Sequence, residues 1–139
     1  MHLLDVNVWL ALAFKRHSQH ASAVAWFQAT TAPCVFCRIT QAGFLRLASS
    51  PAAMQTAAVS NADAWFAYDQ FLADPHVLFA DEPTGIEARW RSYTQLATSS
   101  PKIWMDAYLA AFAELSGFEV VTFDRAFHQY QNLKSTILR

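Results

Sequence analysis

The sequence has few of the features that mark disulfide-rich, disordered or membrane proteins. Its 139 residues include only two cysteines and three glycines, and charged residues make up 15% of the total. Two cysteines exclude a disulfide framework, and an apolar fraction of 54% excludes disorder. No apolar run approaches the roughly 20 residues that span a bilayer, and the start of the chain lacks the basic region of a secretory signal. We therefore expect one cytoplasmic domain over residues 1–139, without membrane association.

Positive charge is also scarce. Ten Lys and Arg residues stand against eleven Asp and Glu residues, so the formal net charge is −1. Such a chain has no broad positive field to attract nucleic acid, and a nucleic-acid substrate would need a bound metal and a few local cations. The high apolar fraction instead suggests that a partner covers some apolar surface, so we expect a dimer or an obligate complex.

The two cysteines, Cys34 and Cys37, form a C-x-x-C pattern inside an apolar run. A redox or zinc element would be an alternative. However, the chain has no second cysteine pair, and Val35-Phe36 continues a strand rather than opening a turn. We expect two reduced, buried thiols.

Apolar runs of strand length alternate with segments of helical periodicity. The expected strands lie at residues 2–5, 32–37, 76–80 and 119–123, with a short edge strand at 133–138. The expected helices lie at residues 6–14, from about 18, and at 39–49, 60–74, 86–97 and 104–116. Ser60 or Asn61 is the expected N-cap of one helix, and Gly117 the C-cap of another. This order predicts right-handed β-α-β units in a three-layer α/β/α domain with a central, mostly parallel sheet of four or five strands.

Three aspartates end or follow short apolar runs. Asp5 closes the first expected strand, Asp124 follows the fourth, and Asp106 lies in the first turn of the last helix. In parallel sheets the ligand lies beyond the carboxyl ends of the strands, so these carboxylates are expected to converge. Converging carboxylates repel one another unless a hard divalent cation such as Mg²⁺ or Mn²⁺ compensates them. We interpret the three as metal ligands.

Each aspartate also has a purely local interpretation. Asp5 suits a helix N-cap, Asp124 suits the cap of a turn, and Asp106 suits the first turn of a helix, where the dipole favours an acid. Three such coincidences in one chain are less economical than a shared site. Asn7 and Thr122 lie two residues from Asp5 and Asp124, on the same side if strand geometry persists. We expect both to position water or phosphate.

Several blocks of the sequence resemble PIN domains. Residues 3–9 (LLDVNVW) are similar to the opening of that family, and residues 106–113 and 120–124 to its closing blocks. Residues 39–47 resemble the helix that carries the family's second acid. The similarity covers nearly the whole chain and is greatest to the VapC toxins of bacterial type II toxin-antitoxin pairs. It implies a Mg²⁺- or Mn²⁺-dependent endoribonuclease that cleaves RNA by metal-activated water. It also implies a homodimer and a small VapB-like antitoxin, through which alone the protein would meet DNA.

One position departs from the family pattern. Gln41 stands where many relatives have a glutamate, and its amide oxygen can coordinate an ion or orient a water but carries no charge. The resemblance then implies three carboxylates instead of four, with any second metal bound weakly or only with substrate. Arg46 resembles an arginine common in these toxins and would pair with an acid or grip a phosphate. A surface helix cation is the alternative for Arg46.

Four other cations, Lys15, Arg16, Lys102 and Arg125, are the expected contacts to the RNA backbone. They form no dense patch, so binding should show a shallow dependence on salt. Trp104 is the first candidate for stacking on a base. Two rival functions stay open: a phosphatase or DNA nuclease that uses the same acids, and an inactive PIN-fold protein that acts with an antitoxin in operon autoregulation. The phosphatase option lacks support because Asp5-Val6-Asn7 offers one acid where D-x-D offers two.

Overall fold

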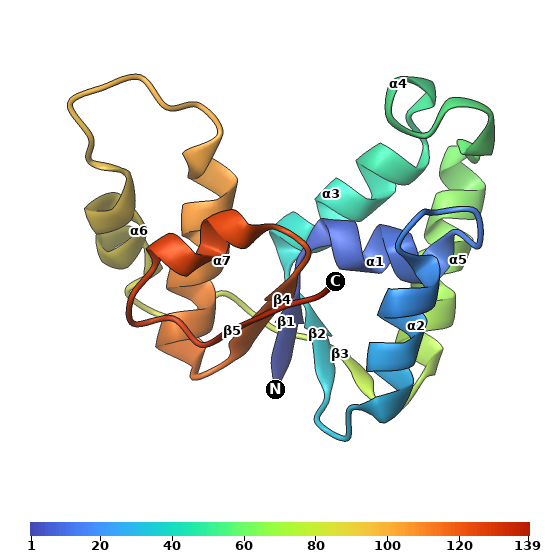
Figure 1. Cartoon of the computed structure of the whole chain (residues 1–139), viewed down its shortest axis with the longest axis horizontal. Helices are drawn as coiled ribbons and strands as arrows, with labels where there is room; N and C mark the ends of the chain where they lie inside the picture. The colour runs from blue at the N-terminus through green and yellow to red at the C-terminus, as the bar shows by residue number, and fades with distance from the viewer.

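A computed structural model describes residues 1–139, and its centre is a five-stranded parallel sheet in the order β3-β2-β1-β4-β5 (Figure 1). The strands are β1 (His2–Leu4), β2 (Cys34–Phe36), β3 (Val77–Phe79), β4 (Glu119–Thr122) and β5 (Ser135–Ile137). The central strand β1 lies between β2 and β4, so the two ends of the chain supply neighbouring strands. The predicted parallel sheet and its fifth edge strand are confirmed.

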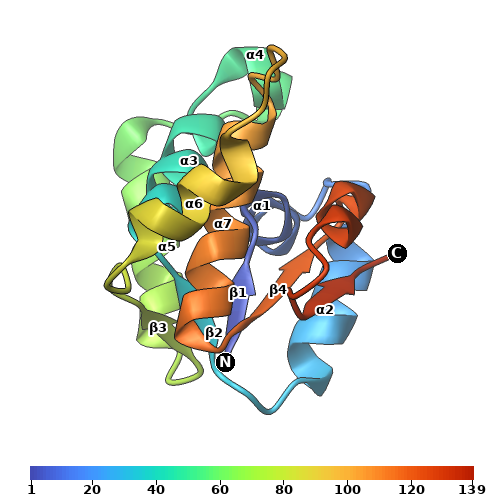
Figure 2. The same cartoon turned by 90° about the vertical axis from the view of Figure 1, so that its left-hand side faces the viewer.

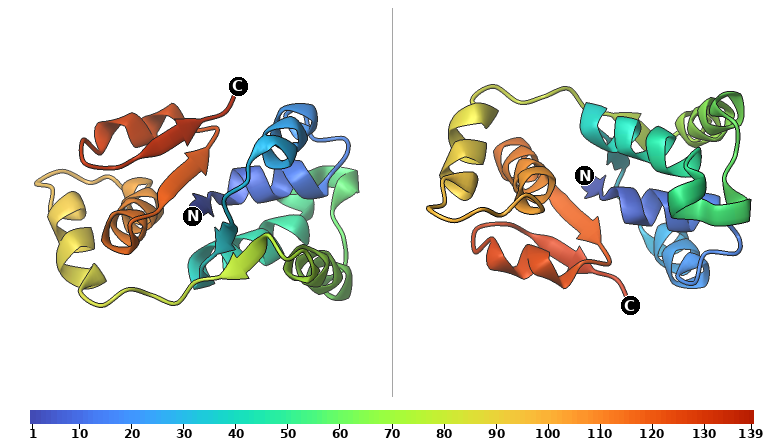
Figure 3. Two further views of the ribbon diagram at one scale, coloured as in Figure 1. Left: turned by 90° about the horizontal axis from the view of Figure 1, so that it is seen from below. Right: turned by 90° about the horizontal axis from the view of Figure 1, so that it is seen from above.

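Helices cover both faces of the sheet. One face carries α1 (Val6–Ala13), α2 (His20–Ala29), α3 (Arg38–Ala48) and α5 (Asn61–Ala73), and the other carries α6 (Ile86–Thr94) and α7 (Ile103–Ser116). Seen from above and below, the two groups lie on opposite sides of β1 (Figure 3). The side chains of Leu3 and Leu4 accordingly enter different core clusters, as the alternation along a strand requires. The three-layer α/β/α architecture is confirmed.

The first core, on the α1 side, is built from aromatic rings. Trp9 stacks on Phe36 with ring centroids 3.8 Å apart, and Phe71 meets Trp9 edge-on at 4.9 Å. Phe44 and Tyr68 close the cluster from α3 and α5. Aromatic pairs in edge-on arrangements, such as Trp9 with Phe71, add to the free energy gained by burial alone.

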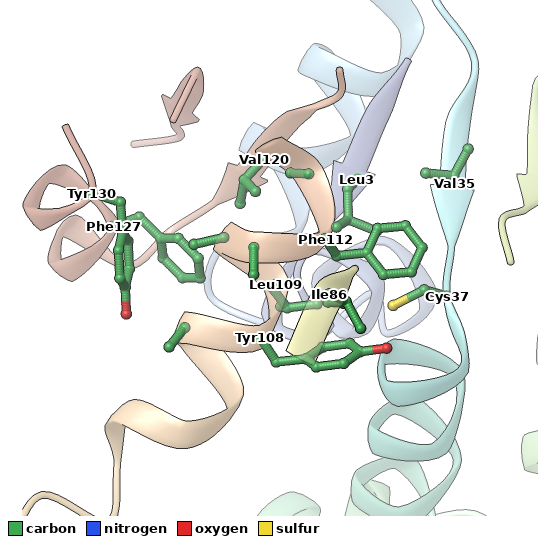
Figure 4. Packing of buried hydrophobic residues seen from close by; sticks show 14 residues of the cluster. Leu3, Val35, Cys37, Ile86, Tyr108, Leu109, Phe112, Val120, Phe127 and Tyr130 are labelled. Atoms are coloured by element: carbon green, nitrogen blue, oxygen red, sulfur yellow. The ribbon is translucent and has the colours of Figure 1, made fainter. Parts of the chain in front are cut away.

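The second core, on the α7 side, depends on small residues. The buried face of α7 includes four alanines, Ala107, Ala110, Ala111 and Ala113, which let the helix approach the sheet closely. Larger groups such as Phe112 and Tyr108 fill the space beside them (Figure 4). Helix α6 lies along the outer side of α7 (Figure 2), where Trp90 meets Tyr108 edge-on at 5.4 Å.

The helix bounds agree with the expected ones to within a few residues, but three short helical segments were not predicted. These are α4 (Pro51–Met54) and the 3₁₀ helices η1 (Gln55–Ala57) and η2 (Arg125–Gln129). Pro51 ends α3 as expected and also starts α4, because it occupies the first helical position while Ser50 caps it. Ser60 is the N-cap of α5, and Gly117 is the C-cap of α7 with φ of 69°.

Both cysteines are free and fully buried. They lie on opposite faces of the sheet, Cys34 in the first core and Cys37 in the second. Burial raises the pKa of the Cys34 thiol to about 12 and also raises that of Cys37. The prediction of two reduced, buried thiols is confirmed.

None of the helices combines the length and the apolarity needed to cross a membrane.

Candidate active site

Asp5 lies at the junction between the central strand and the first helix. Its backbone N–H donates to Val121 O at 2.9 Å, which continues the β1–β4 pairing one residue beyond β1. Its side chain then caps α1, because Oδ1 accepts a hydrogen bond of 2.7 Å from the Val6 N–H. The local cap interpretation of Asp5 is therefore correct, and it leaves the second carboxylate oxygen directed elsewhere.

That second oxygen belongs to a network centred on Thr122. The buried Thr122 hydroxyl donates to Asp5 Oδ2 at 2.7 Å. It accepts from Asn7 Nδ2 at 3.2 Å and from the Asp124 backbone N–H at 3.0 Å. Asn7 Oδ1 in turn accepts from the Phe123 N–H at 3.4 Å. Asp5, Asn7 and Thr122 are thus joined side chain to side chain, and Asp124 joins them through its backbone N–H.

Asp124 follows β4 and begins η2. Its Oδ1 accepts a hydrogen bond of 2.8 Å from the Ala126 N–H, so Asp124 is also an N-cap. Unlike Asp5, the residue is exposed. One oxygen of each of these carboxylates is therefore held by the backbone, and the second oxygen of Asp124 forms no hydrogen bond.

Asp106, in the first turn of α7, completes the acidic group. Burial raises its pKa to about 6, and the charges of Asp5 and Asp124 act in the same direction. Burial also raises the pKa of Asp5, where the hydrogen bond from Thr122 opposes the shift and the charge of Asp124 adds to it. The three carboxylates, contributed by both ends of the chain, thus influence one another electrostatically.

The donor chemistry of this group fits a hard divalent cation. All available donors are oxygens, and none of the three carboxylates forms an ion pair with a lysine, arginine or histidine. The arrangement of the side chains, however, is not that of a formed metal shell: no group of three His, Cys, Asp or Glu side chains is placed so that it could hold an ion. Mutual repulsion and the two caps account for the open arrangement, so binding an ion requires side-chain movement.

Gln41 is buried but turns toward other partners. Its Oε1 accepts a hydrogen bond of 2.5 Å from Arg38 Nη1, and its side chain lies within hydrogen-bonding reach of Tyr68 on α5. None of the three aspartates is among its hydrogen-bond partners. Arg46 lies further along α3, is exposed and forms no ion pair. Neither residue forms a hydrogen bond or ion pair with the acids, and their roles in the site stay predictions.

The predicted cations are dispersed. Arg125 lines a pocket of about 480 Å³ together with His128, Ile137 and Arg139, and no acid lines it. Lys15 and Arg16 line a separate pocket on the loop after α1, and Lys102 is exposed just before α7. Of these four cations, only Arg125 is adjacent in sequence to one of the acids, Asp124.

Trp104 lies on the α6 side of α7. Its ring meets Trp90 edge-on with centroids 6.1 Å apart, and the Trp90 Nε1–H donates to the Trp104 carbonyl at 2.8 Å. Both rings line a pocket of about 480 Å³ between α6 and α7. No contact between Trp104 and the three aspartates is found.

Tyr130 is a residue that the sequence analysis missed. It is buried at the end of η2, and the charges of Asp106 and Asp124 are among the causes that raise its pKa. A signal was present: Phe127 and Tyr130 are three residues apart, the spacing that places side chains on one side of a 3₁₀ helix.

The chain is similar to known proteins along its whole length. Residues 2–133 match the model of the PIN domain family. The sequence is 44% identical to ribonuclease VapC41 of Mycobacterium tuberculosis over 144 aligned positions that cover 99% of each chain. It is 33% identical to ribonuclease VapC38 of the same organism, covering 89% of this chain and 85% of the relative.

The fold is also that of solved structures. VapBC2 from Rickettsia felis, bound to a promoter DNA fragment, superposes with a TM-score of 0.70 at 14% identity, covering 99% of this chain and 98% of the other. VapC20 of M. tuberculosis, a toxin that cleaves the sarcin-ricin loop, superposes with a TM-score of 0.69 at 14% identity over 94% and 95% of the two chains. VapC ribonucleases of the PIN family generally depend on a divalent metal. On the combined evidence of sequence and fold, the chain belongs to the PIN-domain family and, within it, to the VapC-type ribonuclease toxins.

Proposed function

We propose that the protein is a Mg²⁺- or Mn²⁺-dependent endoribonuclease, the toxin of a VapBC-type pair, and that Asp5, Asp106 and Asp124 hold its metal. The observation that carries the proposal is the acidic group itself. Burial, with the charge of Asp124 in addition, raises the pKa of Asp5 and of Asp106, and none of the three carboxylates has a cationic side chain to neutralise it. Partly buried carboxylates such as Asp5 and Asp106 are costly to keep charged unless something compensates their charge.

Each residue of the site has a distinct part in this proposal. Asp106 is free of hydrogen bonds and is able to turn toward an ion, whereas Asp5 is oriented by its bonds to Val6 and Thr122. Asn7 and Thr122 keep the ends of β1 and β4 at a fixed spacing. Because the buried Thr122 hydroxyl already forms three hydrogen bonds, its part is to orient Asp5, and Asn7 is the proposed contact to water or phosphate. When bound, a divalent ion supplies Lewis-acid activation of water and neutralises negative charge at the phosphate.

The basic pocket beside Asp124 is the proposed contact for the RNA backbone. Arg125, His128 and Arg139 surround it without an opposing acid, and neither arginine is engaged in an ion pair. Arginine binds phosphate oxygens through two parallel N–H groups. Because the net charge of the protein is −1, this local cluster carries more weight than any long-range attraction. Lys15, Arg16, Lys102 and Arg46 are proposed as more distant contacts.

The proposed partners are a VapB-like antitoxin and a second copy of the chain, acting in the cytoplasm. Large apolar side chains are exposed on several elements, more than a small monomer usually leaves uncovered. They are Met1, Trp65, Phe66, Leu78, Leu96, Trp104, Met105 and Leu115. The solved relatives from R. felis and from Salmonella typhimurium are complexes of toxin, antitoxin and DNA. DNA contact is therefore assigned to the antitoxin rather than to this chain.

A cleavage assay with three substrates tests the activity. Purified protein with Mn²⁺ is expected to cut RNA and to leave DNA and small phosphomonoesters intact. Asp5→Asn and Asp106→Asn should each abolish cleavage, while Asp69→Asn, which changes an exposed acid on α5, should retain it. Equal activity of the wild type and all three variants would remove Asp5 and Asp106 from the mechanism.

One observation favours a second function, a nuclease-attenuated protein that acts with an antitoxin in operon autoregulation. Gln41 replaces the family's acid and is bound by Arg38. Under this alternative the protein would bind antitoxin but show no Mn²⁺-dependent gain in thermal stability, whereas an enzyme with a real metal site gains stability as the ion is added. The two functions are therefore separable by a titration that does not involve RNA.

A further inference from the structure

Tyr130 carries a buried hydroxyl without a partner. The residue is 5% exposed, and its phenol oxygen has no hydrogen bond in the structure. Its ring is fixed from two sides, since Tyr93 meets it edge-on with centroids 5.0 Å apart and Phe127 lies at 5.9 Å. The hydroxyl therefore has little freedom to turn toward solvent.

Such a group calls for an explanation. Buried polar groups in folded proteins nearly always have a partner, and leaving one unpaired is costly. The second core packs Tyr130 together with Ala107, the residue after Asp106. In Figure 4 the oxygen of Tyr130 points away from Val120 and toward the half of α7 that carries Tyr108. Asp106 lies two residues before Tyr108, in the first turn of α7.

The charges of Asp106 and Asp124 contribute to the raised pKa of the Tyr130 hydroxyl. Burial raises the pKa of Tyr130 to about 12, and Asp106 is the next cause, followed by Tyr93 and Asp124. The phenol consequently stays protonated and remains a donor. Asp106 also lacks any hydrogen bond. The Tyr130 hydroxyl, a donor without an acceptor, and the Asp106 carboxylate, an acceptor without a donor, therefore lie in one region of the protein.

We propose that Tyr130 is a positioning residue of the metal site, whose hydroxyl donates a hydrogen bond to Asp106 once the carboxylates draw together around a divalent cation. The inference rests on the proposed function, because it needs the cation. In the ion-free protein the three carboxylates stay apart and Tyr130 stays unpaired. In the loaded protein the bond would fix the orientation of Asp106, the one ligand that no cap holds.

The variant Tyr130→Phe tests this inference because it removes the oxygen and keeps the ring. In EDTA its melting temperature should equal or exceed that of the wild type, since the lost hydroxyl had no partner. In a Mn²⁺ titration followed by thermal unfolding, the concentration that gives half of the maximal stabilisation should rise about tenfold, as for one hydrogen bond to a charged group. The turnover number for RNA should fall with little change in KM.

Tyr93→Phe is the matched control. The Tyr93 hydroxyl donates to Glu114, away from the acidic group, so this variant should melt at a lower temperature in EDTA but keep the wild-type Mn²⁺ midpoint. A purely structural role for Tyr130 predicts the same pattern for both variants. Opposite responses of the two tyrosines would support the inference.

The outcomes separate this inference from the proposed function. If the wild type responds to Mn²⁺ and Tyr130→Phe responds with the same midpoint, the role of Tyr130 is refuted and the metal site stands. If the wild type does not respond to Mn²⁺, the metal site is wrong and the inference falls with it. If the wild type binds Mn²⁺ with the expected difference between variants but does not cleave RNA, the inference holds and only the ribonuclease proposal fails.

Discussion

The hydroxyl of Thr122 donates a hydrogen bond of 2.7 Å to the carboxylate of Asp5, across 117 positions of sequence. The same oxygen accepts from Asn7 and from the Asp124 backbone. Three groups at the ends of β1 and β4 thus depend on one buried side chain, and this dependence gives the first prediction.

Thr122→Val should lower the free energy of unfolding by about 1–3 kcal/mol, because the nearly isosteric side chain leaves buried polar groups of Asp5 and Asn7 without their partner. Chemical denaturation in EDTA measures this loss. Thr122→Ser, which retains the hydroxyl, should recover most of the lost stability. Equal losses in the two variants would point to packing of the methyl group rather than to the hydrogen bonds.

The pKa of Asp106 predicts a pH-dependent stability in the absence of metal. A carboxyl whose pKa is raised to about 6 in the folded state binds its proton more tightly when folded, so its charge destabilises the fold above pH 6. That penalty shrinks as the pH falls from 6 toward the ordinary aspartate value of 3.8. Asp106→Asn should therefore melt at a higher temperature than the wild type at pH 7.5 in EDTA, with the difference narrowing at pH 5.

Asp69→Asn controls for the loss of one negative charge from the protein and should show no comparable gain. A lower melting temperature for Asp106→Asn than for the wild type at pH 7.5 would contradict the repulsion on which this prediction depends.

Gln41→Glu should not by itself create a fourth metal ligand. The Arg38 guanidinium already binds the Gln41 oxygen at 2.5 Å, and a new carboxylate there would pair with it. We expect less than about a twofold change in the Mn²⁺ midpoint for the single variant, since the new charge is neutralised locally. The double variant Arg38→Gln with Gln41→Glu should shift the midpoint further. A large gain from Gln41→Glu alone would show that position 41 faces the ion.

Arg125→Ala should weaken RNA binding in a salt-dependent way. With Asp5→Asn added to prevent cleavage, the slope of log K against log salt should fall in magnitude by about 0.7, the value for one phosphate contact on a single strand. Arg91→Ala removes the same charge from an exposed pair with Glu87 on α6 and should leave the slope unchanged. Identical slopes for the two variants would exclude the basic pocket beside Asp124 as a phosphate contact.

Much of the fold follows from local pattern in the sequence. The strands and long helices are marked by apolar periodicity, and Ser60 and Gly117 mark helix ends through local capping chemistry. The short segments α4, η1 and η2 were not found, because one turn of helix carries too few residues to show a period. Their boundaries depend instead on single caps such as Ser50 and Asp124.

The acidic group was predictable for a different reason. Parallel strands bring their carboxyl ends to one edge, so Asp5 and Asp124 had to approach each other. The contacts of Gln41 and Tyr130 were not predictable. The pairing of Gln41 with Arg38 depends on rotamers within one turn of α3, and the approach of Tyr130 depends on how η2 folds back against α7. Both are tertiary choices that no spacing in the sequence records.

Helix α3 passes very close to the start of α1, and this contact gives a last prediction. A Cβ atom added at Gly43 would lie 2.8 Å from Val6 Cγ2, next to Asp5. Gly43→Ala should cost about 1–3 kcal/mol through overpacking. Combining it with Val6→Ala should restore part of the loss in a double-mutant cycle. Additive changes in the free energy of unfolding would mean that α1 and α3 separate freely at this contact.

Because Cys34 and Cys37 lie on opposite faces of the sheet, their reactivity reports which side of the protein opens first. Since a β-strand separates the two sulfur atoms and each is fully covered, no thiol reagent reaches either until the layer above it lifts away. The α1–α5 layer shields Cys34 and the α6–α7 layer shields Cys37. The relative alkylation rates of the two residues would therefore reveal which layer detaches first.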